Sequence, residues 1–411
     1  MAGNLTVANG IAKITGHVHA DLQPTMPRLY NRFSKGEGKP TGDRGYEISL
    51  TTALPFNFGT PGDGADMPIG ESLETQRALV FTKRFTLPIR LTGKSMQVLG
   101  KNAKNFSYLK DWSKLNLDGG LSAAHKIYNW LGYGTGNGRL ATISTGANSV
   151  TQTVSNNDRD RFLRKNMRIS IVSSDLATVR GSQRITSEAG NYSTTFTLDA
   201  AINSTTGDLV IVQNTANQCP TGLRQIVDDT TDGSIVFQNI NRNTHTRFRG
   251  QMINASSAAL SHALLRRMLG GQIYPALHEL KRGDYEIWSH PAQATAYQML
   301  GWNKKYYEGK SKSLDLGFVA YEFEGLPWVE DIDAYKTDVM FLKWSGLMKF
   351  TTMDWEWDET TGSIWRQVPS DTAGVAYSDN FEAYYQIICN YGCPNPQEQG
   401  RVHTLAVPTG H

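Results

Sequence analysis

Residues 55–70, with the sequence PFNFGTPGDGADMPIG, decide how this 411-residue chain is interpreted. Proline has no amide donor for a strand ladder and glycine weakens a strand, so we expect this stretch to be a long exposed loop. Apolar strand patterns flank it at residues 46–50 and 79–91, and the second is interrupted at Lys83. The pattern predicts an extended hairpin. Because an isolated hairpin is only marginally stable in water, its apolar face needs a surface to lie against.

The composition limits the class of protein. Hydrophobic residues make up 39 % and charged residues 19 % of the chain, which is typical of globular proteins rather than disordered chains or coiled coils. No apolar run approaches the roughly 18–20 residues that cross a bilayer, and residues 1–15 lack the pattern of a secretory signal. The net charge of +3 comes without the concentrated basic face of a dedicated nucleic-acid binder. We expect a cytosolic origin and only weak, distributed contact with DNA.

Residues 1–44 differ from the rest of the chain. They carry no sustained periodicity and few strong apolar positions, and their basic residues outnumber their acids. Such a segment does not offset its own ordering entropy. The sequence leaves two interpretations open, namely a disordered tail or an arm that becomes ordered by lying on a neighbouring molecule.

Residues 105–131 have the apolar spacing of an amphipathic helix. The adjacent pair Gly119–Gly120 costs about 2 kcal/mol relative to alanine, which predicts a kink or a break. We expect the helix to end at the glycine run 132–138. Residues 160–212 then predict a small β subdomain, with strands at 167–172, 195–198 and 208–212.

Residues beyond 222 alternate between helix and strand patterns. Ser256 or Ser257 is predicted to cap a helix that stops at Gly270–Gly271, and a second short helix follows at 273–280. Strand patterns appear at residues 285–288, 318–323, 340–344 and 381–391. The predicted fold class is α+β.

Candidate chemistry is sparse along this chain. The glycine run 132–138 follows a helix and precedes Arg139, whereas a phosphate loop follows a strand and ends in Lys and Ser or Thr. Neither the pair Cys389–Cys393 nor the pair His17–His19 has further ligands beside it at metal-site spacing. We therefore expect a turn at the glycines and free thiols at the cysteines.

The acidic aromatic stretch 354–359, DWEWDE, allows two interpretations. Its carboxylates suit the paired acids of glycoside hydrolysis. Strand alternation, however, places Trp355 and Trp357 on one face. It places Asp354, Glu356 and Asp358 on the other, which indicates a half-buried edge strand whose charges discourage further pairing. The sequence contains no nucleophile elbow, zinc-protease helix or kinase motif. We predict no catalytic residue, metal ligand or cofactor, and no enzyme activity.

The order of these features resembles the Hong Kong 97-like major capsid proteins of tailed bacteriophages. The segments that carry the resemblance are GLRQIVDD at 222–229, INR at 240–242, YEIWSHP at 285–291, GLPWVED at 325–331 and residues 339–350. The resemblance implies an N-terminal arm (1–44), an extended β-hairpin loop or E-loop (45–96), a peripheral domain with a spine helix (97–149), a β-rich insertion (150–220), an axial domain (221–375) and a return strand to the peripheral domain (376–411).

The resemblance implies a subunit that self-assembles into the hexamers and pentamers of an icosahedral phage head around double-stranded DNA. It implies a place in the virion after assembly in the bacterial host cytoplasm, away from any membrane. The implied partners are a separate scaffolding protein and a portal protein, with a decoration protein as a further candidate. Deleting residues 1–44 is expected to abolish shells and leave a folded body. The candidate inter-subunit contacts are Arg28, Arg32, Phe56, Phe58, Pro61, Met67, Pro68 and Lys83.

Two alternatives stay open. The same fold builds encapsulin nanocompartments that enclose enzymes, which predicts shells that hold protein and need no scaffold. An unrelated alternative is a β-rich glycan-binding or glycan-cleaving protein that uses Trp355, Trp357 and Trp365. It predicts a monomer or small oligomer with sugar affinity.

Overall fold

The computed structural model describes residues 28–42, 45–53, 59–60, 63, 66, 69–70, 72–93, 107–155, 163–188, 194–230, 235–277, 284–302, 312–313, 319–359, 362–369 and 377–409. The chain forms two compact units. Unit 1 contains Lys83–Asn129 and Thr351–Cys389 with the residues up to Arg28, and unit 2 contains Leu29–Thr82, Trp130–Phe350 and Asn390–His411. The chain re-enters unit 1 at Thr351, and the predicted domain bounds, with the axial domain at 221–375, stay predictions.

The sheet of unit 1 joins strands that are far apart in the sequence. Strand β5 (Lys83–Thr92) pairs antiparallel with β22 (Tyr377–Gly392), from Lys83 opposite Cys389 to Thr92 opposite Asn380. Strands β20 (Met348–Trp357) and β21 (Arg366–Pro369) also pair with β22. The expected aromatic strand at 381–391 is therefore confirmed as the central strand of this sheet.

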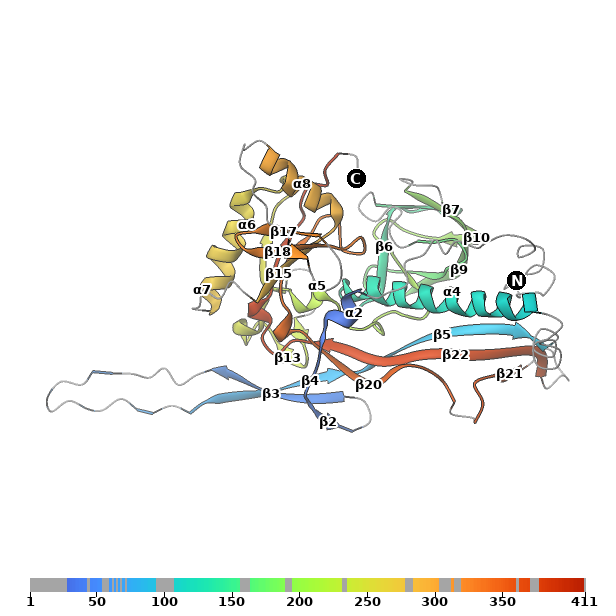
Figure 1. Cartoon of the computed structure of the whole chain (residues 1–411), viewed down its shortest axis with the longest axis horizontal. Helices are drawn as coiled ribbons and strands as arrows, with labels where there is room; N and C mark the ends of the chain where they lie inside the picture. Colours follow the sequence, from blue (N-terminus) through green and yellow to red (C-terminus); the bar gives the residue numbers. More distant parts are fainter. Residues whose placement is uncertain are drawn as a thin grey trace. The chain divides into compact units, whose positions relative to one another are not determined.

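Helix α4 (Ser107–Gly132) is continuous, so the predicted break at Gly119–Gly120 is wrong. A Cβ added at Gly120 would lie 3.5 Å from side-chain atoms of Leu87 and Ile89, which places this turn of the helix directly on β5 (Figure 1). Ala124 and Tyr128 are fully buried on the same helix. Packing of the helix on the sheet outweighs the low helix propensity of two glycines.

The predicted strand at 79–91 is two strands in different sheets. Strand β4 (Glu74–Phe81) pairs with β3 (Gly45–Ala53), and β5 begins after Thr82. In β4 the buried side chains are Ala78 and Val80, whereas Phe81, expected on the apolar face, is 54 % exposed. The buried positions shift by one residue between the strands because each strand faces a different core.

A closed barrel of consecutive strands lies in unit 2. The strands are β6 (Arg139–Thr145), β7 (Asn148–Val154), β8 (Arg168–Val172), β9 (Val179–Glu188), β10 (Thr195–Asn203) and β11 (Leu209–Val212), drawn in shades of green in Figure 1. The order around the barrel is β10-β7-β6-β11-β8-β9. The expected strands at 167–172, 195–198 and 208–212 coincide with β8, β10 and β11. Gly136 and Gly138, at the expected turn out of α4, have positive φ values of 78° and 83°.

Unit 2 also contains a seven-stranded sheet with the order β14-β23-β19-β15-β18-β17-β16. The bounds are β14 (Gln251–Asn254), β15 (Tyr285–Ser289), β16 (Lys312–Ser313), β17 (Val319–Phe323), β18 (Leu326–Glu330), β19 (Val339–Lys343) and β23 (Gly400–His403). The expected strands at 285–288, 318–323 and 340–344 are confirmed as β15, β17 and β19. A shared core of aliphatic and aromatic side chains includes Ile287, Trp328 and Phe341, each fully buried.

The helix after β14 differs from the prediction at both of its ends. Helix α6 (His262–Met268) is capped by Ser261, whose Oγ accepts a hydrogen bond from the Leu264 amide, and not by Ser256 or Ser257. The latter two have positive φ in a turn. The helix does not stop at Gly270–Gly271 but continues through a π-helical turn (Leu269–Ile273) into α7 (Tyr274–Leu277). Helix α8 (Pro291–Trp302) follows β15.

Candidate subunit-contact surfaces

The β3–β4 hairpin presents large apolar side chains to solvent. Its strands pair from Gly45 opposite Phe81 to Ala53 opposite Glu74. Ile69 is 81 % exposed and Leu73 is 49 % exposed in the connection, and Phe81 is exposed at the base. Residues 54–76 carry four acids and no lysine or arginine. The connection is therefore acidic and carries exposed apolar side chains.

The predicted contact residues have different outcomes. Phe56, Phe58, Pro61, Met67 and Pro68 lie outside the described residues. Lys83 is the first residue of β5, opposite Cys389, and Arg28 is the first residue of helix α2 (Arg28–Arg32). Arg32 forms an ion pair with Glu286 of the same chain. That these residues contact a neighbouring subunit stays a prediction.

The segment after Arg28 is packed into unit 2. Leu29, Tyr30 and Phe33 are buried, with exposed fractions of 0 %, 5 % and 2 %. Ser34 and Lys35 form strand β1, which pairs parallel with β20 at Met348 and Lys349. The expectation that residues 1–44 have no packing of their own is therefore wrong for residues 29–36. Sequence reasoning missed Leu29, Tyr30 and Phe33 because five helical residues are too few to show a periodic pattern.

A carboxylate and aromatic rings hold this segment. Glu286 of β15 receives the Arg32 guanidinium and two indole Nε1–H donors, from Trp288 at 2.9 Å and Trp344 at 2.8 Å. The Phe33 ring stacks on Tyr391 at 4.1 Å and meets the edge of Trp344 at 5.5 Å. The charged hydrogen bond fixes the helix, and the rings bury its apolar side.

A buried ion cluster ties distant segments of unit 2 together. Arg224 of helix α5 (Leu223–Ile226) donates to both oxygens of Asp338 at 2.9 and 3.0 Å, and Arg401 of β23 lies 3.6 Å from the same carboxylate. Burial alone raises the pKa of Asp338, but the two guanidinium groups overcome it and lower the pKa to about 2. The Tyr335 ring lies 3.3 Å from the Arg224 guanidinium carbon. Because the carboxylate is only 2 % exposed, the cluster is structural.

Residues 354–357 of the acidic aromatic stretch belong to β20, as the strand interpretation predicted. Trp355 stacks on Tyr385 at 5.2 Å and contacts His125 and Tyr128 of α4 edge-on. Asp358 forms ion pairs with Arg84 and Arg366, at 3.4 and 2.8 Å. An open pocket of about 590 Å³ adjoins the rings and is lined by Met353, Trp355, Glu356, Trp357, Asp358, Glu359, Tyr385 and Gln386. The geometry does not favour a pair of catalytic acids, because two arginines hold Asp358.

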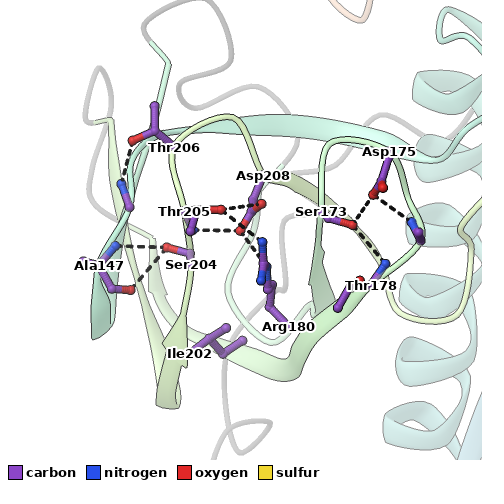
Figure 2. Close-up of polar contacts among 12 residues, drawn as sticks. Ala147, Ser173, Asp175, Thr178, Arg180, Ile202, Ser204, Thr205, Thr206 and Asp208 are labelled. Atoms are coloured by element: carbon purple, nitrogen blue, oxygen red, sulfur yellow. Dashed lines mark hydrogen bonds and ion pairs between the residues drawn. The ribbon is translucent and has the colours of Figure 1, made fainter.

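At one end of the barrel, polar contacts link the turns. The turns at 145–148, 173–178 and 204–208, which we call the turn end, meet there (Figure 2). Ala147 and Ser204 exchange hydrogen bonds, and the Gly146 amide donates to Thr206 Oγ1 at 3.2 Å. Asp208 accepts from the Thr205 amide at 2.7 Å and lies 3.3 Å from Arg180 Nε. The polar groups of the turn end are therefore largely paired with one another.

Other expectations concern the cysteines and metals. Cys219, Cys389 and Cys393 are all buried thiols, and burial raises the pKa of Cys393 to about 12. Within the described ranges no group of His, Cys, Asp or Glu has the arrangement of a metal site. His17 and His19 lie outside those ranges. Among the described helices, none has the length and apolar character to span a membrane.

Comparison with known proteins identifies the fold. No protein-family model and no curated protein sequence matches the chain. A solved structure of the cyanophage A-1(L) capsid is similar with a TM-score of 0.55 at 12 % identity, over 95 % of both chains. A Gordonia phage Cozz structure has a TM-score of 0.46 at 9 % identity, over 99 % of this chain and 97 % of that one. The SrpI encapsulin of Synechococcus elongatus has a TM-score of 0.42 at 8 % identity, over 98 % and 97 %. Over nearly its whole length, the chain shares the fold of the cyanophage A-1(L) capsid protein, in agreement with the fold that the resemblance to Hong Kong 97-like proteins predicted.

Proposed function

We propose that this chain is the major capsid protein of a tailed bacteriophage, a subunit without enzyme activity that assembles into hexamers and pentamers of an icosahedral shell around double-stranded DNA. The observation that carries the proposal is the likeness to the cyanophage A-1(L) capsid over 95 % of both chains. Because the shared fold takes up almost the whole chain, little of it remains for a separate catalytic domain.

Features of the described chain support this proposal. The β3–β4 hairpin exposes Ile69 and Phe81, and such side chains are typical of contacts completed by another molecule. Ring-forming assembly requires heterologous contacts, in which one surface of each copy meets a different surface of the next. Obligate contacts of this kind bury about 2,000 Å² or more. We propose residues 45–96 as the extended loop and Phe56, Phe58, Pro61, Met67 and Pro68 as its contact residues.

The proposed partners follow from the same function. They are other copies of this chain, a separate scaffolding protein, a portal protein, a candidate decoration protein and DNA held by weak, non-specific contact. The proposed location is the virion, after assembly in the host cytoplasm. In addition to the hairpin residues, we propose Arg28, Arg32 and Lys83 as contacts with a neighbouring subunit.

Electron microscopy tests the proposal directly. The chain is expressed with and without the scaffolding protein of its own gene neighbourhood, and purified material is imaged by negative stain. We expect closed shells of uniform diameter in at least one condition. A variant in which Asn-Gly replaces residues 54–73 retains β3 and β4 but loses the loop, and should not form shells. A monomeric wild-type chain under all conditions would refute the proposal.

The contents of the shells separate phage capsids from encapsulins. A phage capsid assembles with scaffold and packages nucleic acid in infected cells, whereas a nanocompartment forms alone around protein. The ratio of absorbance at 260 and 280 nm, and gel analysis of purified particles, distinguishes them. The glycan alternative gains no support, because Trp355 is packed on Tyr385 and Asp358 is paired with arginine.

A further inference from the structure

Two arginines face each other on the barrel. Arg168 of β8 lies directly opposite Arg184 of β9 in the antiparallel ladder. Two residues further along β8, the hydroxyl oxygens of Ser170 and Ser182 are 2.7 Å apart, so the side chains on this face project side by side. Arg168 is exposed and Arg184 is half-buried. Directly opposed side chains have Cβ atoms about 5 Å apart, and like charges at that distance repel each other.

No acid of the described chain forms an ion pair with either arginine. The nearby Asp199 carboxylate accepts a hydrogen bond from the backbone amide of Arg184, at 3.1 Å. Lys165 is exposed in the turn before β8, which is hydrogen-bonded to β9, and adds a third cation. Asp175 lies at the turn end, beyond the other end of β8 (Figure 2). Arg168, Arg184 and Lys165 therefore form a cationic surface, which we call the basic patch.

Unit 1 carries a surface of the opposite charge. Glu356 and Glu359 are exposed and line the open pocket at the end of β20. The rings of Trp357 and Tyr385 line the same pocket, with their centroids 5.1 Å apart. Within the described ranges neither glutamate forms an ion pair, whereas Asp358 is held by two arginines. We call the two glutamates and the two rings the acidic pocket.

The acidic pocket has the chemistry that binds a guanidinium group. A guanidinium donates paired hydrogen bonds to a carboxylate and stacks on aromatic faces, which an ammonium group does less well. The basic patch offers two guanidinium groups, and the acidic pocket offers two carboxylates beside two rings. Carboxylates placed between the opposed arginines also remove the repulsion that the arginines exert on each other.

We propose that the basic patch of one copy docks into the acidic pocket of a second copy, so that Arg168 and Arg184 pair with the two glutamates. The inference rests on the proposed function, since it names two surfaces that meet between subunits of the shell. Both halves of the contact are present on this chain, which favours a second copy as the partner. Because the two surfaces differ, the contact is heterologous, and contacts of this kind form rings when their rotation closes.

Charge exchange tests the pairing. The double variant Arg168→Glu/Arg184→Glu should form few shells, because it places acids against acids. The double variant Glu356→Arg/Glu359→Arg should fail in the same way, and the variant with all four changes should assemble again. An exposed ion pair changes affinity by up to about fivefold, and a shell repeats this loss at every contact. Failure of the fourfold variant, with its subunits folded, overturns the pairing.

The stability of the isolated subunit separates docking from a structural role. Arg168→Gln removes one of two opposed cations, so the unfolding midpoint of the barrel in urea should stay unchanged or rise while the yield of shells falls. Arg267→Gln, the same change at an exposed position of α6, should alter neither quantity. If Arg168→Gln lowers the midpoint and the yield together, Arg168 stabilises its own barrel, and the docking is overturned.

Cross-linking in mixed shells identifies the partner. Chains carrying Arg168→Cys and chains carrying Glu356→Cys are co-assembled with an excess of wild-type chains and treated with a short bismaleimide. We expect a dimer band only when both variants are present, because the native cysteines are buried. Intact shells that contain both variants but give no dimer band overturn the proposal and leave the capsid function standing.

The remaining outcomes assign the basic patch elsewhere. If Arg168→Glu/Arg184→Glu forms normal shells that hold less DNA, the patch meets nucleic acid. If the same variant loses shells only in the presence of the scaffolding protein, the patch meets that protein. Either result overturns a second copy as the partner. If the wild-type chain forms no shells, the proposed function fails and the inference falls with it.

Discussion

The barrel and the seven-stranded sheet of unit 2 use the sequence in opposite ways. All barrel strands come from one continuous segment, residues 139–212, and its first and last strands are neighbours, with Arg139 opposite Ile211. The sheet instead joins β14 to β23, so that Gln251 lies opposite Gly400. The barrel closes on itself, whereas the sheet depends on contacts between distant parts of the chain.

This difference explains the position of two charged side-chain pairs, Arg32–Glu286 and Arg224–Asp338, which we call the first and the second clamp. Arg32 and Glu286 are 254 residues apart, and Arg224 and Asp338 are 114 residues apart. Bringing such segments together costs loop-closure entropy before any contact forms. Strong, charge-assisted hydrogen bonds at the ends of long loops offset part of that cost. We therefore expect the barrel and the sheet to unfold as separate cooperative units.

Removing the first clamp should have the largest effect. Deletion of residues 1–36 removes the buried side chains of Leu29 and Phe33 and leaves Glu286 without its arginine. Burial of each large apolar side chain contributes about 1.5–3 kcal/mol, so the loss should exceed about 5 kcal/mol and unfold the sheet. Urea denaturation followed by tryptophan fluorescence measures this, since Trp288 and Trp344 report on Glu286.

Deletion of residues 1–27 is the matched control. It leaves α2 and β1 in place and should barely change the unfolding midpoint of the isolated subunit. Because Leu29 and Phe33 are buried, we expect a deletion to residue 44 to destabilise the sheet, in contrast to the folded body expected from the sequence alone. Equal midpoints for the two deletions would mean that the packing of residues 29–36 contributes nothing to stability.

Loss of the second clamp should be nearly as large. Asp338→Ala leaves Arg401, which is fully buried, and Arg224 without their carboxylate. Breaking a buried ion pair by removing one partner costs about 3–5 kcal/mol. The sheet transition in urea should shift, while the barrel transition stays where it is. A parallel shift of both transitions would show that the two regions unfold together.

The Asp338 carboxylate should also make the stability of the seven-stranded sheet depend on pH. The pKa of Asp338 is about 2 in the folded chain against 3.8 for the unperturbed group, so its contribution is fully present above pH 3.8 and is lost as the pH falls toward 2. The shift corresponds to about 2 kcal/mol. Unfolding free energies measured between pH 5 and pH 2 should fall more steeply for the wild-type chain than for Asp338→Asn. Identical slopes would remove Asp338 as the cause.

Regular local patterns account for what the sequence could predict. The apolar spacing of residues 105–131 predicted α4, and alternation predicted β8, β15 and β22, because these patterns repeat over several turns or strand pairs. The tryptophans of β20 were placed on the half-buried face for the same reason. The strand partners of β22 and the closure of the barrel stayed beyond prediction, since register between distant segments leaves no local trace.

The errors have local physical causes. Thr82 separates β4 from β5, and no glycine or proline stands at residues 81–83 to mark this junction, although the buried positions change from Val80 to Ile89 and Leu91. Gly120 was expected to break a helix, but the helix packs on the sheet at this turn, where an added Cβ would lie 3.5 Å from Leu87 and Ile89. The packing of Leu29 and Phe33 depends on Glu286 and Tyr391, which lie hundreds of residues away.

Two glycine-to-alanine changes in the barrel, at Gly146 and Gly207, should have the smallest effects. They test whether the barrel unfolds separately from the seven-stranded sheet. A Cβ at Gly146 would lie 2.6 Å from Thr205 Cα and 2.8 Å from Ser204 O, so Gly146→Ala must displace the 204–208 turn. Because Thr205 and Thr206 are exposed and can shift, we expect a loss of about 1–2 kcal/mol, confined to the barrel transition.

Gly207→Ala tests the same turn without a clash. Nothing lies within 4 Å of a Cβ there, and only the positive φ of 92° opposes the side chain, so the expected loss is about 1 kcal/mol. Both variants should leave the sheet transition unchanged in urea, and hydrogen exchange should locate the lost protection in β6–β11. If Gly146→Ala instead destabilised the sheet as much as the barrel, the barrel would not be a self-contained unit, because strain in its turns would be carried by the distant contacts of the rest of unit 2.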